Sequence, residues 1–141
     1  ILMNLVYAAT AYPAGLLSDK TDRFRVLAAG LALLIAADLV LGFATTILGV
    51  AAGIVLWGLH MGFTQGLFAA MIADTAPAEL RGTAFGIFNL LGGIATLVAS
   101  VLAGALWEFF GPQVTFLAGA AISLLALTGA ILARREFAIV R

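Results

Sequence analysis

Cysteine is absent from this 141-residue sequence, and histidine occurs only once. Without cysteine there can be no disulfide, and one histidine with no thiolate does not suggest a metal site. Seven dispersed basic residues, balanced by seven acidic ones, do not form the concentrated positive surface that binds nucleic acid. No nucleotide-binding loop of the GxxxxGKS or GxxxxGKT type is present, so ATP hydrolysis is excluded from this chain. We therefore predict no cofactor and no nucleic-acid partner.

Charge of either sign is also scarce. Charged residues make up 10% of the sequence, whereas soluble domains contain about 25%. Hydrophobic residues make up 64%, and the mean hydropathy is +1.18. A soluble chain of this length has too much surface for its volume to hide so many apolar side chains. The composition therefore predicts an integral membrane protein whose main partner is the lipid bilayer.

Long uncharged runs define the expected architecture. Each complete run reaches the ~20 helical residues that cross about 30 Å of hydrocarbon. β-Barrel strands would be about half as long and would alternate in polarity. We predict an all-α, polytopic helical membrane protein, a partial bundle of five transmembrane helices at about 1–17, 26–46, 48–72, 82–107 and 114–133. Because the chain opens at Ile1, already inside an apolar run, we expect a fragment that begins within a helix.

Basic residues occur in alternate loops only. In a five-helix arrangement all of them fall on one side of the membrane, and cytoplasmic loops are the ones enriched in lysine and arginine. We therefore expect a cytoplasmic C-terminus in a bacterial inner (plasma) membrane. The three basic segments contain Lys20, Arg23 and Arg25; Arg81; and Arg134, Arg135 and Arg141.

The loop after the first run carries the most specific motif. Its sequence from Gly15 to Arg25 resembles GxxxD(R/K)xG(R/K)x(R/K), the loop signature of the major facilitator superfamily. The matching residues are Gly15, Asp19, Lys20, Arg23 and Arg25. Asp22 stands where the family usually has a second glycine. In the family the signature follows the second helix and, more weakly, the eighth. Four apolar runs come after it here, and that number favours the copy after the eighth helix.

A second segment supports this resemblance. Residues 74–86, with Pro77, Arg81, Gly82 and Gly86, look like the family's loop between helices ten and eleven. The resemblance implies that the chain forms helices eight to twelve, in the C-terminal half of a twelve-helix transporter. It further implies alternating access to a midplane cavity, with transport of a small-molecule substrate, expected to be coupled to protons. We expect the fragment to be inactive without its missing N-terminal half.

The signature loop has two interpretations. Asp19 at the membrane edge can accept hydrogen bonds from a helix N-terminus or pair with an arginine, and such a cluster can hold one conformation and break in another. The alternative is a solvated loop whose basic residues only set orientation. We predict a cytoplasmic gate formed by Gly15, Asp19, Lys20, Arg23, Arg25 and Arg81.

The run at 48–72 combines two helical faces. Gly58, Gly62, Gly66 and Ala70 form a ridge of small residues that suits close helix packing. The other face mixes aromatic and polar groups, as a binding cavity does. His60 lies midway along the run, where it could contact substrate or relay protons; the alternative is a histidine hydrogen-bonded to a neighbouring helix. The candidate cavity residues over the whole chain are Asn4, Tyr7, Trp57, His60, Thr64, Gln65 and Asn89.

Two further polar features lie inside apolar runs. Asn89 begins a stripe of small and weakly polar residues that favours helix packing over cavity lining. Asp38 is the one acid inside a run, and as an ionised group it would cost about 2.5–3.5 kcal/mol at the membrane centre. It must therefore be paired, protonated or facing water. His60 and Asp38 are the candidate proton-coupling residues, although a structural contact is the stronger alternative for Asp38.

Two other classes of function compete with transport. A membrane sensor or assembly module could keep the same fold without transporting anything, and the polar groups near His60 would then be dispensable. An integral membrane enzyme needs several ionisable groups that converge at one depth. Only Asp38 and His60 are available, and they lie on different runs. We therefore predict that the chain is not an enzyme.

Overall fold

The computed structural model describes the backbone of residues 1–139 and the side chains of residues 1–134. The predicted tail residues Arg135 and Arg141 lie outside the described side chains. Helices account for almost all of this backbone, and no strand occurs among residues 1–139. The elements are α1 (Leu2–Lys20), α2 (Arg23–Phe43), α3 (Ile47–Thr75), the short 3₁₀ helix η1 (Ala78–Leu80) and α4 (Arg81–Ile139). The prediction of an all-α protein is confirmed.

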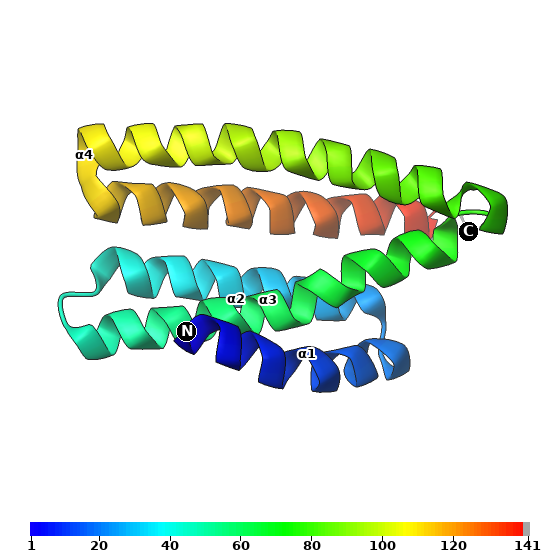
Figure 1. Cartoon of the computed structure of the whole chain (residues 1–141), viewed down its shortest axis with the longest axis horizontal. Coiled ribbons are helices and arrows are strands. Elements are labelled where there is room, and N and C mark those ends of the chain that lie inside the picture. Colours follow the sequence, from blue (N-terminus) through cyan, green and yellow to red (C-terminus); the bar gives the residue numbers. More distant parts are fainter. Residues whose placement is uncertain (140–141) are drawn as a thin grey trace.

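The longest element, α4, is a hairpin rather than a straight rod. Gly111 interrupts its helical geometry with φ 81° and ψ 177°, a conformation that is essentially restricted to glycine. Pro112 follows and cannot donate to the helix that precedes it. Figure 1 shows the chain doubling back at this point. We call residues 81–110 the outgoing arm and residues 112–134 the return arm.

Three helical segments are long and apolar enough to cross a membrane, namely Arg23–Phe43, Ile47–Thr75 and Ala78–Arg134. The third contains both arms of α4. The shorter α1 is not among them, because residues such as Asn4, Tyr12 and Asp19 dilute its apolar side chains. A polytopic membrane protein is therefore supported, while the prediction of five spans is not confirmed by this criterion.

The turns between helices alternate between the two ends of the bundle. The α1–α2 turn, the α3–α4 connection and the end of α4 lie at one end, and the turns at 44–46 and Gly111 lie at the other (Figure 1). All described basic residues therefore gather at one end, which we call the basic end. They are Lys20, Arg23, Arg25, Arg81 and Arg134.

The interior consists of small residues at helix crossings. No large side chain is fully buried among the described residues, and the buried apolar positions include Ala14, Ala37 and Ala120. The helix α2 packs on α3 and on the return arm, and α1 packs mainly on α3. Such close approach of backbones is how helices associate where lipid leaves no hydrophobic driving force between them. The outgoing arm is the least covered segment, with nearly every residue exposed.

Candidate functional site

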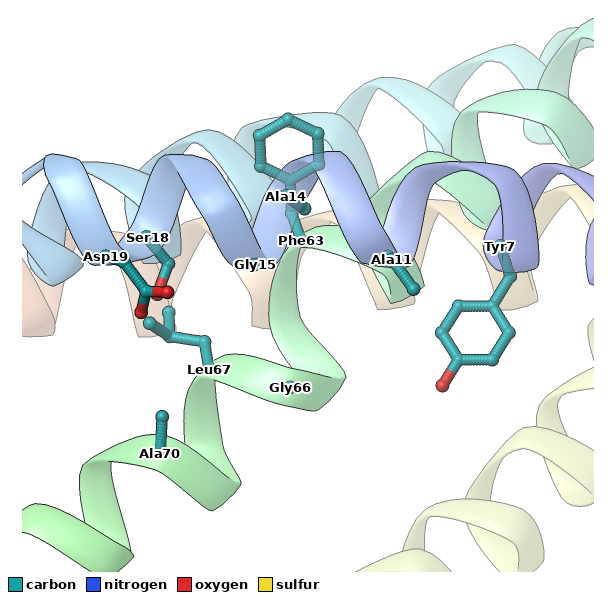
Figure 2. A pocket seen from close by; sticks show the side chains of 11 residues that line it. Tyr7, Ala11, Ala14, Gly15, Ser18, Asp19, Phe63, Gly66, Leu67 and Ala70 are labelled. Atoms are coloured by element: carbon teal, nitrogen blue, oxygen red, sulfur yellow. The ribbon is translucent and has the colours of Figure 1, made fainter.

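A small open groove lies between α1 and α3. Its volume is about 190 Å³, below the ~300–1,000 Å³ of pockets that enclose a drug-sized ligand. Figure 2 shows its wall on α1, with the turn of α3 that carries Gly66 opposite. The lining residues are Tyr7, Ala11, Ala14, Gly15, Ser18 and Asp19 from α1, and Gly62, Phe63, Gly66, Leu67 and Ala70 from α3.

The groove forms where α1 and α3 separate. A Cβ on Gly58 would lie 2.8 Å from the Met3 carbonyl oxygen, and one on Gly62 would lie 2.8 Å from Thr10 Cβ. A Cβ on Gly66, about one turn beyond Gly62, would meet nothing within 4 Å. Figure 2 shows α3 turning away from α1 at Gly66, while α1 continues straight. The small-residue ridge of α3 therefore divides into a contact half and a groove half.

The polar groups of the groove are an acid and two hydroxyls. Asp19 and Ser18 lie at its basic end, and Tyr7 points from α1 into the open space further along (Figure 2). Ser18 is 7% exposed and donates no hydrogen bond among the described residues. No basic residue lines the groove. Its chemistry suits a ligand with an apolar body and a hydrogen-bond donor or positive charge.

His60 and Thr64 face α2 rather than the groove. His60 Nδ1 donates to the Gly30 carbonyl oxygen at 2.8 Å, which requires the proton on Nδ1. Thr64 is 4% exposed, and its hydroxyl donates to the His60 carbonyl oxygen at 2.9 Å. Gly30 makes room for both, because a Cβ there would lie 2.6 Å from Thr64 Cγ2. This geometry matches the structural alternative for His60 that the sequence left open.

Asp38 is buried between α2 and the return arm. It is 4% exposed, and a Cβ on Gly119 would lie 2.8 Å from its Oδ2. Neither ion pair among the described residues involves it, and no described donor forms a hydrogen bond with its carboxylate. The carboxyl group therefore occupies a recess that exists because residue 119 has no side chain.

The remaining cavity candidates are dispersed. Trp57 packs edge-on against Phe116, with ring centroids 6.3 Å apart, and Phe116 contacts Trp107 across the α4 turn at 6.1 Å. Asn4, Gln65 and Asn89 are exposed and lie outside the groove lining. Among the seven predicted cavity residues, only Tyr7 lines the groove.

The signature loop makes contacts at the basic end. Asp22 caps α2 by accepting the Phe24 backbone N–H at 3.0 Å, and it also pairs with Arg134 at the end of the return arm. Arg23 pairs with Asp74 at the end of α3, at 2.5 Å. The predicted gate residues Lys20, Arg25 and Arg81 are exposed. Gly15 and Asp19 are exposed as well and line the groove.

Comparison with known proteins identifies the family. The sequence matches the Major Facilitator Superfamily over residues 1–139, almost the whole chain. The chain belongs to the major facilitator superfamily. It is also 36% identical over 130 residues to an uncharacterized MFS-type transporter of Methanocaldococcus jannaschii. That alignment covers 89% of this chain and 31% of the relative, so the chain spans about a third of the relative's length.

As a major facilitator chain, the protein departs from the family signature at Asp22. The turn there does not require glycine, because Asp22 has φ −55° and ψ 118°, which any residue adopts readily. The aspartate instead supplies an N-cap that glycine lacks. The aspartate that replaces the signature glycine therefore stabilises the start of α2.

Sequence reasoning missed several residues that the structure places at these sites. Ser18 and Phe63 line the groove, and Gly119 receives Asp38. Ser18 sits inside the signature loop, so its position next to Asp19 was an available signal. No such signal existed for Gly119, because its role depends on which helix lies opposite.

Proposed function

We propose that this chain is the C-terminal part of a secondary active transporter that moves a small solute across the plasma membrane by alternating access. In this proposal it supplies helices eight to twelve, each arm of α4 crosses the membrane once, and α1 crosses as well. The missing N-terminal half supplies the other side of the cavity. Family membership supports membrane transport in general.

The observation that carries the solute site is the groove between α1 and α3. Transporter sites lie near the membrane midplane at the interface between the structural repeats, and this groove opens on the side of α1 and α3 that we propose faces that interface. Tyr7 points from α1 into open space beside the groove (Figure 2). The exposed polar residues Asn4, Gln65 and Asn89 are proposed to face the same cavity when the second half is present. Trp57, His60 and Thr64 then support its wall from behind.

The orientation follows from the basic end. Lysine and arginine in short loops are retained on the cytoplasmic side. The basic end and the C-terminus are therefore proposed to be cytoplasmic, where Gly15, Asp19, Lys20, Arg23, Arg25 and Arg81 form the gate. Asp19 is the residue best placed to act there, because it stands at the end of the groove on that side.

Proton coupling is the finer part of the proposal. Asp38 is the better candidate for the proton carrier, because a buried carboxyl with no ion pair among the described residues can exist as a neutral acid. His60 is the second candidate, although its Nδ1 is engaged by Gly30. Neither residue lines the groove, so coupling through them would act on helix contacts rather than on the solute directly.

The experiment uses the longer protein that the proposal requires, in inverted membrane vesicles with a pH-sensitive dye. Substrates are screened for solute-dependent proton movement, and the active one is then tested with Tyr7→Phe, Asp38→Asn and His60→Ala. Tyr12→Phe is the matched control, because Tyr12 lies on the same helix and is 74% exposed outside the groove. We expect Tyr7→Phe to raise the apparent KM and Tyr12→Phe to leave it unchanged.

Other outcomes separate the parts of the proposal. Uptake by the isolated 141-residue chain in proteoliposomes would refute the need for a second half. Solute movement with no proton signal would remove the coupling roles of Asp38 and His60 but keep the transporter. No movement of any solute by folded protein would favour a non-transporting sensor or assembly module.

A further inference from the structure

The groove between α1 and α3 has a polar end and an apolar stretch. Ser18 and Asp19 lie at the basic end, and both point toward the turn of α3 that carries Leu67 (Figure 2). Most of the remaining wall consists of small residues, namely Ala11, Ala14 and Gly15 on α1 and Gly62, Gly66 and Ala70 on α3. A ligand in this part of the groove therefore meets two adjacent oxygen-bearing side chains at one end and a narrow apolar surface along the rest.

The Ser18 hydroxyl has no hydrogen-bond partner among the described residues, although Ser18 is only 7% exposed. Six threonines of the described helices donate to the carbonyl oxygen four residues earlier, as Thr10 does to Val6, whereas Ser18 does not. Buried polar groups are nearly always paired, and no side-chain oxygen or nitrogen of the described chain is both fully enclosed and unpaired. The hydroxyl is therefore open to the groove, where a ligand can supply its partner.

The Asp19 carboxylate is also without a partner in the described part of the chain. Neither ion pair includes it, and no described donor forms a hydrogen bond with it. No lysine, arginine or histidine lines the groove. A neutral ligand would displace water from this charge without replacing it, and an anion would be repelled by it. The groove therefore favours a positively charged ligand.

The number of hydrogen-bond donors distinguishes one cation from another. A primary ammonium group carries three N–H donors, which is enough for the carboxylate and the hydroxyl together. A trimethylammonium group carries none, so it would balance the charge of Asp19 and leave Ser18 unpaired. The groove volume of about 190 Å³ limits the attached apolar body to a small ring or a short chain.

We propose that the groove binds small primary amines, with the ammonium group between Asp19 and Ser18 and the apolar body over Gly15 and Gly66. A Cβ on either glycine would meet nothing within 4 Å, so the body occupies space that these two residues leave open. This inference rests on the proposed function, because it names the class of solute for the same groove.

The test is protection of a single cysteine against alkylation by iodoacetamide, a neutral reagent, in a chain that has no native cysteine. Gly66→Cys places the thiol in the groove, and Ala70→Cys is a second reporter there. Gly93→Cys on the outgoing arm is the matched control, because a Cβ meets nothing within 4 Å at Gly93 or at Gly66. In phosphatidylcholine nanodiscs, whose lipid has no primary amine, 2-phenylethylamine should slow alkylation of Gly66→Cys and leave Gly93→Cys unchanged.

Three analogues with the same ring measure the selectivity. 2-Phenylethanol should need at least about a 10-fold higher concentration for half-protection, because it lacks the charge, and the trimethylammonium analogue about 5-fold, because it lacks the donors. 3-Phenylpropanoate should not protect. Equal protection by the amine and the alcohol, or equal slowing at Gly93→Cys, would overturn the proposal.

Variants in the Gly66→Cys background assign the two polar contacts. Asp19→Asn should weaken protection by the amine about 10-fold, and Glu79→Gln, which removes an exposed acid at the same end outside the groove lining, should not change it. Ser18→Ala should weaken the amine about 5-fold and leave the trimethylammonium analogue unchanged, because only the amine uses the hydroxyl. Unchanged protection in Asp19→Asn would show that the amine binds elsewhere.

Transport assays on the longer protein separate this inference from the proposed function. Protection by the amine without movement of any solute would keep the amine site and remove the transporter. Solute transport by the longer protein, with no protection of Gly66→Cys or Ala70→Cys by the amine, would keep the transporter and overturn the amine site.

Discussion

The two arms of α4 are alike in sequence and different in surroundings. Both are apolar helices rich in small residues, and they are joined by one glycine. The return arm packs against α2, with Ala120 and Ser123 buried. The outgoing arm is exposed over nearly its whole length. A stripe of small residues therefore marks a helix that can be approached closely, but it does not reveal whether a partner is present.

The glycines show a similar contrast between the packed helices α2 and α3 and the outgoing arm. A Cβ on Gly30, Gly53, Gly58 or Gly62 would meet another helix at 2.5–2.8 Å, so these residues are required where they stand. A Cβ on any glycine of the outgoing arm would meet nothing within 4 Å; these are Gly82, Gly86, Gly92, Gly93 and Gly104. The same substitution should therefore destabilise the packed helices strongly and the outgoing arm very little.

The largest effect is expected for Gly58→Leu. The new Cβ would lie 2.8 Å from the backbone oxygen of Met3 and 2.9 Å from Val6 Cβ, and a backbone atom cannot rotate aside. We expect a loss of about 3 kcal/mol, at the upper end of overpacking penalties. Gly86→Leu is the matched control and should change stability by less than about 0.5 kcal/mol. Thermal unfolding in detergent measures both.

This pair of variants also tests the proposed N-terminal half. In the isolated chain, equal destabilisation by Gly86→Leu would show that the outgoing arm is covered there. In the longer protein proposed above, Gly86→Leu should become harmful if the other half seats against the outgoing arm. Tolerance in both settings would indicate that this face meets lipid.

The second effect concerns the turn that separates the arms. Gly111→Ala places a side chain at φ 81°, which costs about 1–3 kcal/mol. Because the chain contains no cysteine, spin labels can be introduced at the exposed positions Val98 and Leu125 without removing native residues. We expect the distance distribution between these labels to broaden in Gly111→Ala.

Gly129→Ala is the control for the turn variant. Gly129 lies on the return arm, has no positive φ, and has open space around its Cβ position. It should leave the label distance unchanged. A narrow, unchanged distribution in Gly111→Ala would mean that helix contacts, rather than the turn, hold the arms together.

Sequence patterns predicted the elements better than their partners. The apolar runs at 26–46 and 48–72 correspond to α2 and α3, and the break before 114 corresponds to the turn at Gly111. Length and hydropathy are properties of a single segment, so the sequence of that segment is enough to predict a membrane helix. Which helices pack together depends on how well their surfaces fit one another, and those surfaces come from segments far apart in the sequence.

The candidate site shows the limit most clearly. The ridge containing Gly58 and Gly62 was predicted to pack closely, and it does so against α1. The periodicity could not show that α3 would turn away from α1 near Gly66, because that depends on which helices lie beside it. It also could not show that His60 would contact Gly30, because the sequence of α3 does not reveal which helix lies against each of its faces.

The third prediction tests the recess that holds Asp38. Gly119→Ala would bring a Cβ within 2.8 Å of Asp38 Oδ2. The carboxyl can move but would lose its fit, so we expect a loss of about 1–2 kcal/mol. Asp38→Ala combined with Gly119→Ala should recover most of that loss, because the clash disappears. Gly129→Ala on the same arm should be neutral or slightly stabilising.

The double variant decides what Gly119 does. Recovery would establish that the glycine is needed only to admit the carboxyl. If the double variant is no more stable than Gly119→Ala, the new Cβ clashes with an atom of α2 other than the Asp38 carboxyl. Thermal unfolding of the four proteins, monitored by circular dichroism, gives the coupling between the two residues.

The smallest effect is expected for His60→Leu. The substitution removes the hydrogen bond from Nδ1 to the Gly30 carbonyl, and that oxygen also accepts the regular bond of α2, so it is not left without a partner. Side-chain hydrogen bonds between membrane helices contribute about 0.6 kcal/mol on average, and we expect a loss of that size. His60→Gln should lose less, because its amide can still donate.

Stability and transport together separate the two interpretations of this histidine. A residue that only joins α3 to α2 should show a small loss of stability in His60→Leu, with solute transport reduced in proportion to the folded protein that remains. A proton relay should instead lose coupling in His60→Gln as well, because an amide cannot take up and release a proton at neutral pH. Full transport with intact proton coupling in both variants would leave His60 as a helix contact whose removal the fold tolerates.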